Sequence, residues 1–257
     1  MNIAEVPVDS ALLALLDETR VLSREVVPGN VVREWSADGS EVRIVYSACS
    51  HSDLAAVIQR ELRLAREVGA DFEWKVYGHD KPSGLPATLC AAGLKPGPRE
   101  MVLALNLCDA PTTIRKRVED AHEVRTVNVA DLVDYERISL ESGRKDAADE
   151  RERLAVSLVA EPESIQVHVA YRDGVPVSGG RLYLAANGTA ELAGGRTIPR
   201  CRRQGFFTAT VLSRMSAAIA AGAQTLWVDA LPSSAPIFIA LGFSAVTWTE
   251  PYVWSRS

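Results

Sequence analysis

Several features that mark other classes of protein are scarce in this sequence of 257 residues. It has only four cysteines, none of them in a Cys-x-x-Cys pair, so we expect reduced thiols and no disulfide framework. Its four histidines are isolated, without the i, i+4 spacing that puts two imidazoles on one face of a helix. We therefore expect no metal site.

Long apolar runs and an excess of basic residues are also missing. No run approaches the ~20 apolar residues that span a bilayer, and the first residues, Met1 to Glu5, lack the basic segment of a signal peptide. The formal net charge is −5, whereas general binding to nucleic acid or to membrane surfaces is favoured by excess positive charge. These absences predict a soluble, cytoplasmic protein that binds neither nucleic acid nor membranes.

The residues that are present are typical of a folded globular protein. Hydrophobic residues make up 47% and charged residues 24% of the chain, which excludes intrinsic disorder. At ~150 residues per domain, the length indicates one large domain or two small ones.

Apolar periodicity and turn residues predict alternating helices and strands. Helices are predicted at 9–24, 51–68, 85–92, 129–141, 146–160, 205–221 and 234–241. Strands are predicted at 31–35, 41–47, 72–77, 101–107, 125–129, 165–171, 175–184 and 189–198, with a further strand at 225–230 and a strand pair at 245–254. Asp173-Gly174 and Asn187-Gly188 predict two-residue hairpin turns, in which both central residues have positive φ.

Two segments of the first half recur in the second. Residues 69–74, Gly-Ala-Asp-Phe-Glu-Trp, match 222–227, Gly-Ala-Gln-Thr-Leu-Trp, and residues 91–94, Ala-Ala-Gly-Leu, match 240–243, Ala-Leu-Gly-Phe. Both matches stand between the same elements in the same order, which is typical of a tandem repeat of one fold. The predicted organisation is a domain at 1–110, a mixed-charge linker at 111–123 and a second domain at 124–257.

The segment 197–208, Thr-Ile-Pro-Arg-Cys-Arg-Arg-Gln-Gly-Phe-Phe-Thr, carries most of the chemical information. A strand ends, a basic loop follows and a long helix starts near Gly205. The first N–H groups of a helix have no partner within the helix, and the helix dipole places partial positive charge there, so this point suits an anion such as a diphosphate. Composition alone is equally compatible with a solvated basic loop that caps the helix. The nearby arginines are Arg196, Arg200, Arg202 and Arg203.

This segment resembles the acetyl-CoA motif of the GNAT superfamily of N-acetyltransferases, Arg/Gln-x-x-Gly-x-Gly/Ala, here residues 202–207. The strand at 226–230, the short helix after it and Leu241-Gly242-Phe243 resemble the second signature of that family. The resemblance covers roughly residues 124–257 and implies an α+β fold, a central mixed sheet flanked by helices, repeated twice. The first half resembles the same fold without its phosphate loop, so we expect a degenerate, non-catalytic copy.

The resemblance also implies a cofactor, acetyl-CoA as co-substrate, and the residues that contact it. These are Thr197, Ile198, Arg202, Arg203, Gln204, Gly205, Phe206, Phe207, Thr208 and Ser234. Two positions depart from the family pattern. Phe207 replaces a small residue, and Phe238 stands where many relatives have a tyrosine that protonates the departing thiolate.

The implied reaction is direct acetyl transfer to a primary amine of a small molecule or peptide, by a monomer or homodimer. Glu191 is the candidate general base, because relatives often have a carboxylate on this strand, and an outward-facing strand glutamate is an equal alternative. Tyr252 is the candidate acid, with an oxyanion-binding N–H near Thr197 or Ile198. Asp229 and Glu250 are weaker candidates for the base, and His168 is expected to be structural.

Two other functions remain open from the sequence. One is a binding module that holds CoA or a metabolite as a sensor or scaffold without transfer, which the substitution of Phe238 favours. The other is transfer of a longer acyl chain, which depends on the depth of a pocket that the sequence does not reveal.

Overall fold

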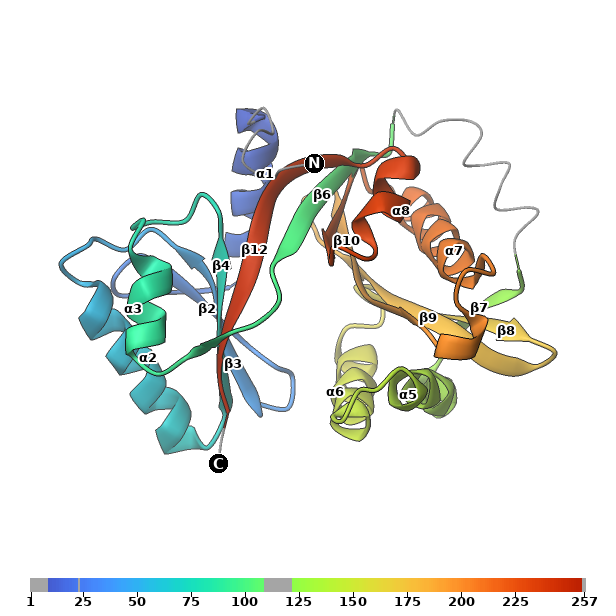
Figure 1. Cartoon of the computed structure of the whole chain (residues 1–257), viewed down its shortest axis with the longest axis horizontal. Coiled ribbons are helices and arrows are strands. Elements are labelled where there is room, and N and C mark those ends of the chain that lie inside the picture. The colour runs from blue at the N-terminus through green and yellow to red at the C-terminus, as the bar shows by residue number, and fades with distance from the viewer. Residues whose placement is uncertain (1–8, 23, 109–121, 256–257) are drawn as a thin grey trace. The chain divides into compact units, whose positions relative to one another are not determined.

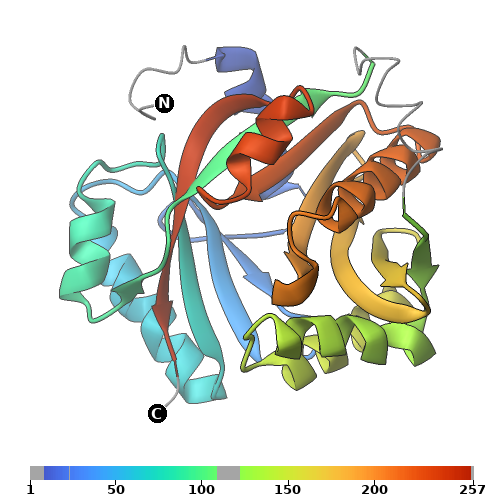
Figure 2. The same ribbon diagram turned by 45° about the vertical axis from the view of Figure 1, so that its right-hand side comes forward.

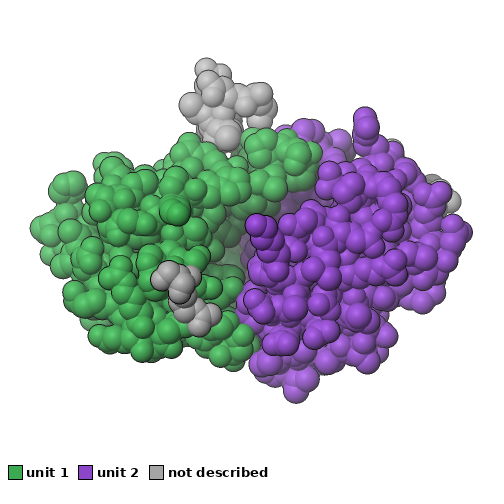
Figure 3. Space-filling model, turned by 60° about the horizontal axis from the view of Figure 1, so that its bottom comes forward, with its two compact units in different colours: residues 1–102, 229–235, 245–257 green, residues 103–228, 236–244 purple. Residues whose placement is uncertain are grey.

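The computed structural model describes residues 9–22, 24–108 and 122–255 (Figure 1). The chain forms two compact units, shown in Figure 3: unit 1 comprises 1–102, 229–235 and 245–257, and unit 2 comprises 103–228 and 236–244. Most of the predicted linker, 111–123, lies outside the described residues. None of the helices that are described is long and apolar enough to cross a membrane.

The two units are not consecutive stretches of the chain, in contrast to the predicted domains 1–110 and 124–257. The cause is β12 (Ser244–Trp254), which pairs antiparallel with β4 (Asp71–Tyr77), so that Tyr252 lies opposite Trp74. The last strand of the chain therefore completes the sheet of unit 1. Repeated sequence patterns reveal similar elements, but they do not say which sheet a strand joins.

Unit 1 has the strand order β1-β2-β3-β4-β12, with β5 also paired to β12. Among these strand pairs of unit 1, only β3 and β4 are parallel, as expected for two strands that are joined through a helix. The elements not yet bounded are α1 (Ser10–Val21), β1 (Glu25–Val27), β2 (Val31–Trp35), β3 (Glu41–Ser47), α2 (Leu54–Val68), α3 (Leu85–Ala91), β5 (Lys95–Pro96) and β6 (Glu100–Asn106), which enters unit 2 at Leu103.

The helix α2 illustrates how the sequence specifies unit 1. Val57, Ile58 and Leu62 lie on one face and are buried in the core with Phe72 and Trp74 of β4. The helix ends at Gly69, whose φ of 70° is left-handed, as a glycine after the last turn predicts.

Unit 2 has the strand order β11-β10-β9-β8-β7, and only β10 and β11 are parallel. Figure 2 shows α5 and α6 on one side of these strands and α7 on the other. The elements are β7 (Val124–Val127), η2 (Val129–Asp131), α5 (Leu132–Glu141), α6 (Ala147–Ala160), β8 (Ile165–Arg172), β9 (Val175–Leu184), β10 (Thr189–Thr197), η3 (Pro199–Cys201), α7 (Phe206–Ala220), β11 (Thr225–Ala230) and α8 (Ala235–Ala240).

Two local predictions need correction. At Asp173-Gly174 both residues have positive φ, as predicted, but in the second turn only Gly188 does. That turn is longer, because the N–H of Gly188 donates to Ala185 and the side chain of Asn187 accepts from Thr189. The predicted strand pair at 245–254 is the single strand β12.

Candidate functional site

A bulge in β10 is the first feature of the site. The parallel ladder between β10 and β11 runs from Thr189 opposite Thr225 to Leu192 opposite Val228. Directly after it, the register of β10 against β9 shifts between Ala193 and Arg196. Two residues of β10 thus face one residue of β9, which bends the strand at the point where its pairing with β11 ends.

Glycines make this bulge possible. Gly194 has a φ of 58°, and its carbonyl accepts a hydrogen bond of 2.7 Å from the Tyr135 hydroxyl on α5. A Cβ at Gly194 would lie 2.5 Å from that hydroxyl oxygen, and a Cβ at Gly195 would lie 2.9 Å from the ring of Phe207. Both faces of the bulge are therefore packed against helices, α5 on one side and α7 on the other.

The loop after β10 turns the chain sharply into α7. Arg203 and Gly205 both have left-handed φ, 60° and 88°, and Gly205 is the residue before the first turn of the helix. Within the described residues, nothing accepts a hydrogen bond from the backbone N–H groups of residues 205–208. This segment therefore presents four unused donors at the positive end of a helix of 15 residues.

The expected oxyanion donors are partly used by the fold. The N–H of Ile198 donates to the Val177 carbonyl at 3.0 Å, so it is not available to a ligand. The hydroxyl of Thr197 is buried and lies 2.7 Å from the hydroxyl of Ser178. Both residues anchor the end of β10 against β9, and their predicted contact with the cofactor is not supported by these bonds.

Only two of the four arginines near the loop remain for a ligand. Arg196 makes two bonds to the carboxylate of Glu150, at 2.7 and 3.0 Å, and Arg200 is ion-paired with Glu141. Arg202 uses its Nε to donate to the Thr197 carbonyl at 3.2 Å, whereas Arg203 is exposed. The side chains of Arg202 and Arg203 are thus the basic groups of the loop that no carboxylate among the described residues neutralises.

His122 contacts the loop, which the sequence did not suggest. Its Nε2 donates to the carbonyl of Gln204 at 2.7 Å, and its ring stacks on Phe206 at 3.9 Å between centroids. The side chain of Gln204 is held further by a bond from its Nε2 to the Arg200 carbonyl at 3.0 Å. His122 is an isolated histidine within the segment predicted as a linker, so no periodicity or motif could have indicated this contact.

Glu191 lies on β10 before the bulge, and its side chain is exposed. It is opposite Tyr183 of β9 and Trp227 of β11. Of the weaker candidates, Asp229 is ion-paired with Lys75, and Glu250 accepts a hydrogen bond of 3.1 Å from Arg99. Of the three carboxylates, Glu191 is the one on the strand that leads into the loop.

The structure gives no support to Tyr252 as the catalytic acid. It is buried in the core of unit 1, whereas the loop at 197–208 belongs to unit 2. Its hydroxyl donates to Glu250 at 2.9 Å, and burial and this carboxylate raise its pKa to about 12. Phe238 is buried between Phe207 and Phe243, so the expected position of the acid offers no proton.

Two further residues complete the comparison with the sequence. Ser234 is grouped with unit 1, and its hydroxyl donates to the Leu231 carbonyl at 3.2 Å. His168 is buried between Ser213 and Gln166, at 2.9 and 3.1 Å, which agrees with a structural role.

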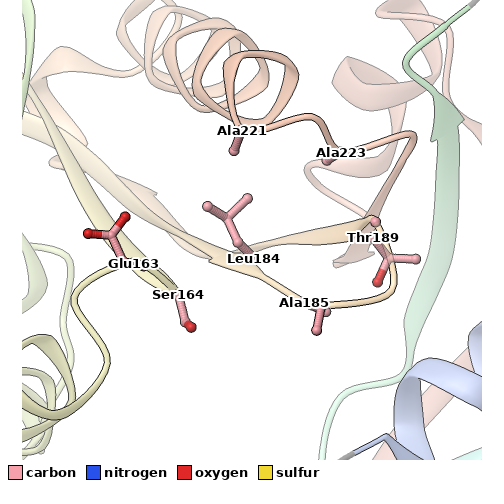
Figure 4. A pocket seen from close by; sticks show the side chains of 9 residues that line it. Glu163, Ser164, Leu184, Ala185, Thr189, Ala221 and Ala223 are labelled. Atoms are coloured by element: carbon pink, nitrogen blue, oxygen red, sulfur yellow. The ribbon is translucent and has the colours of Figure 1, made fainter.

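A surface pocket of about 400 Å³ lies at the other end of β10 and α7 from the loop (Figure 4). Its lining includes Glu163, the start of β10 at Thr189, and Ala221 and Ala223 after α7. None of the predicted site residues lines it, so the candidate site is the exposed loop rather than this pocket.

A scan against protein-family models gave no match, and a search of curated proteins found no similar sequence. The fold, in contrast, has clear counterparts among solved structures. A GCN5-related N-acetyltransferase from Kribbella flavida is similar with a TM-score of 0.67, at 17% identity, over 96% of this chain and 95% of that one. The chain has the GNAT fold.

Two further GNAT structures support this assignment. A putative acetyltransferase of the GNAT family from Novosphingobium aromaticivorans has a TM-score of 0.56, at 16% identity, and both chains are covered completely. A tandem GNAT protein from the clavulanic acid biosynthesis pathway has a TM-score of 0.58, at 13% identity, over 85% of this chain and 76% of that one. The GNAT fold agrees with the expectation of a mixed sheet flanked by helices.

Proposed function

We propose that the protein is an acetyl-CoA-dependent N-acetyltransferase whose active site is in unit 2. The observation that carries this proposal is the row of unused N–H groups at residues 205–208, placed at the start of α7 directly after a bulged strand. A helix N-terminus with free donors binds phosphate groups, and solved structures with the same fold are named as acetyltransferases.

In this proposal the diphosphate of acetyl-CoA lies against these four N–H groups. Gly205 has no side chain to fill that space, and Arg202 and Arg203 supply positive charge from the loop. Phe206 and His122, stacked on each other, hold the backbone of the loop through the bond to Gln204. The coenzyme itself supplies the activated acetyl group.

The acetyl group passes directly to a primary amine. Glu191 takes a proton from the ammonium group of the acceptor, directly or through water, because only the neutral amine is nucleophilic. The nitrogen then forms a bond to the acetyl carbon and loses its second proton to water, the carbon–sulfur bond breaks, and the electron pair leaves on sulfur. Because a thiol has a pKa of ~8.5, the CoA thiolate leaves without a catalytic acid and then takes a proton from solvent. This reaction is therefore compatible with a phenylalanine, Phe238, at the position where relatives have the acid.

The segment of unit 1 that corresponds to the loop at 197–208 is unsuited to a diphosphate, which favours one active site per chain. The corresponding strand-to-helix segment of unit 1 carries Asp53 at the start of α2, with Ser50 donating to its carboxylate at 2.7 Å. A negative charge at this position repels a diphosphate. We therefore place CoA binding in unit 2 alone.

Exchange of Gly205 for aspartate tests the cofactor site. Gly205→Asp places a carboxylate where the diphosphate would bind, so we expect the Kd for acetyl-CoA, measured by calorimetry, to rise by roughly a hundredfold or more. Gly222→Asp is the matched control, because Gly222 has a similar φ of 83° at the other end of α7 with open space around it. Equal binding by the Gly205 variant and the control would contradict the proposal.

A transfer assay separates the enzyme from a sensor or scaffold. Release of free CoA thiol from acetyl-CoA is measured with a panel of amines, with and without the Glu191→Gln substitution. We expect turnover with at least one amine and a loss of roughly a hundredfold or more in kcat for the variant. Tight binding of acetyl-CoA with no turnover on any amine would instead support the non-catalytic module that Phe238 favours.

A further inference from the structure

One face of the unit 2 sheet gathers several polar groups around Glu191. On β9 and β10, Tyr183 lies opposite Glu191 and Arg181 opposite Ala193, so these side chains share a face. Trp227 of β11, paired with Glu191 on its other side, belongs to the same face. The face thus carries a carboxylate, a guanidinium and an indole within neighbouring strands.

Two hydrogen-bond donors on this face have no partner. The Nε of Arg181 and the Nε1 of Trp227 are buried, and no acceptor for either exists among the residues that the structure describes. Arg181 also lies directly at the bulge, since a Cβ at Gly194 would be 2.8 Å from its Nε. Buried donors without acceptors are rare in folded proteins, because each costs the free energy of its lost hydration.

Arg181 shares its carboxylate partner, Glu150, with Arg196. Glu150 is bound by both terminal nitrogens of Arg196, and its distance to the Nη1 of Arg181 is longer, 3.3 Å. Arg214 of α7, on the other side of these strands, donates to the carbonyls of Arg181 and Ala193. On the face of Arg181, two arginines, Arg181 and Arg196, therefore share one carboxylate, that of Glu150.

Arg181 stays charged in this environment. Burial opposes its charge, but Tyr135, Tyr183, Glu150 and Glu191 together hold its pKa above the usual value. A charged guanidinium with an unused N–H is suited to an anionic oxygen acceptor such as a carboxylate.

We propose that the acceptor is an amine that also carries a carboxylate, as in an amino acid, with the carboxylate bound by Arg181 and Trp227 and the amine at Glu191. This inference rests on the proposed acetyl transfer. Arg181 and Tyr183 are two residues apart on β9, roughly 7 Å along the strand. Glu191 lies opposite Tyr183, so a substrate whose amine and carboxylate are separated by one or two carbons fits between Glu191 and Arg181.

The test compares matched acceptors that differ only in the carboxylate. The twenty L-amino acids and the corresponding L-amino acid amides are assayed with saturating acetyl-CoA by release of CoA thiol. For the side chains that react, we expect kcat/KM to be roughly tenfold or more higher for the acid than for its amide. Equal values for acids and amides would overturn the inference while leaving acetyl transfer intact.

Variants then assign the preference to Arg181. Arg181→Gln should abolish the difference between acid and amide and leave the KM for acetyl-CoA unchanged, and Arg181→Lys should keep part of the difference. Arg151→Gln is the control, because it removes a surface arginine that is paired with Glu136. A variant that slows acids and amides alike would contradict the role of Arg181.

A result in which none of the tested amines reacts is also decisive. If no amine of either series is acetylated although acetyl-CoA binds, the proposed function fails, and the inference fails with it. If simple amines without a carboxylate react as well as the acids do, only the inference fails.

Discussion

Arginines that lie close together in the sequence of unit 2 differ in whether a carboxylate neutralises them. Arg196 and Arg200 belong to the same basic run in the sequence as Arg202 and Arg203, yet both are ion-paired with glutamates of helices far away in the chain. Charge patterning identified the run, but it could not predict which arginines are neutralised, because the partners meet only in the folded state.

His168 should make the stability of the protein depend on pH. It is buried beside Arg214, and burial together with this positive charge lowers its pKa from 6.5 to about 4. The unfolded chain therefore binds a proton at a higher pH than the folded chain does, and stability falls as the pH drops from about 6.5 toward 4. We expect a loss of about 2 to 3 kcal/mol between pH 7.5 and pH 4.5 from this residue.

The measurement is urea unfolding at several pH values. The variant His168→Gln should lose this part of the pH dependence, whereas a substitution of the exposed His51 should retain it. An unchanged slope in the His168 variant would show that the imidazole titrates alike in both states.

At the scale of elements, most helices and strands follow from periodicity and turn residues. The helix α2 and its end at Gly69 are examples, since local apolar spacing and a left-handed glycine were sufficient to predict them. The bulge at Gly194 could not be predicted, because it depends on the pairing of β10 with β9 and on the packing of Tyr135 against the strand.

The bulge gives a prediction about stability. Gly194→Ala introduces a methyl group 2.5 Å from the Tyr135 hydroxyl at a residue with positive φ, so we expect a loss of about 2 to 4 kcal/mol. Gly174→Ala has a comparable φ of 75° with open space around it, and it should cost only about 1 kcal/mol. Urea unfolding measures both, and equal losses would mean that the contact with Tyr135 contributes nothing.

For the whole molecule, the tandem repeat was visible in the sequence. The pairing of the last strand of the chain, β12, with β4 of the first half was not. The repeat predicts two similar folds, and the GNAT fold is found over the full length. The repeated sequence pattern does not say whether β12 pairs within the C-terminal half or with β4, because β-pairing partners are set by tertiary contacts.

This pairing predicts that the N-terminal half does not fold alone. A fragment of residues 1–110 lacks β12 and leaves the edge of β4 and the core around Trp74 incomplete. We expect no cooperative thermal unfolding of this fragment by circular dichroism, and recovery of cooperative unfolding when it is coexpressed with residues 111–257. A fragment that unfolds alone at the temperature of the full chain would contradict the assignment of β12.

The most direct test of the function is a crystal structure of the protein grown with acetyl-CoA. We predict that oxygen atoms of the diphosphate lie within about 3.2 Å of backbone nitrogens among residues 205–208. A coenzyme bound at any other place, with these nitrogens free of contact, would contradict the proposed active site.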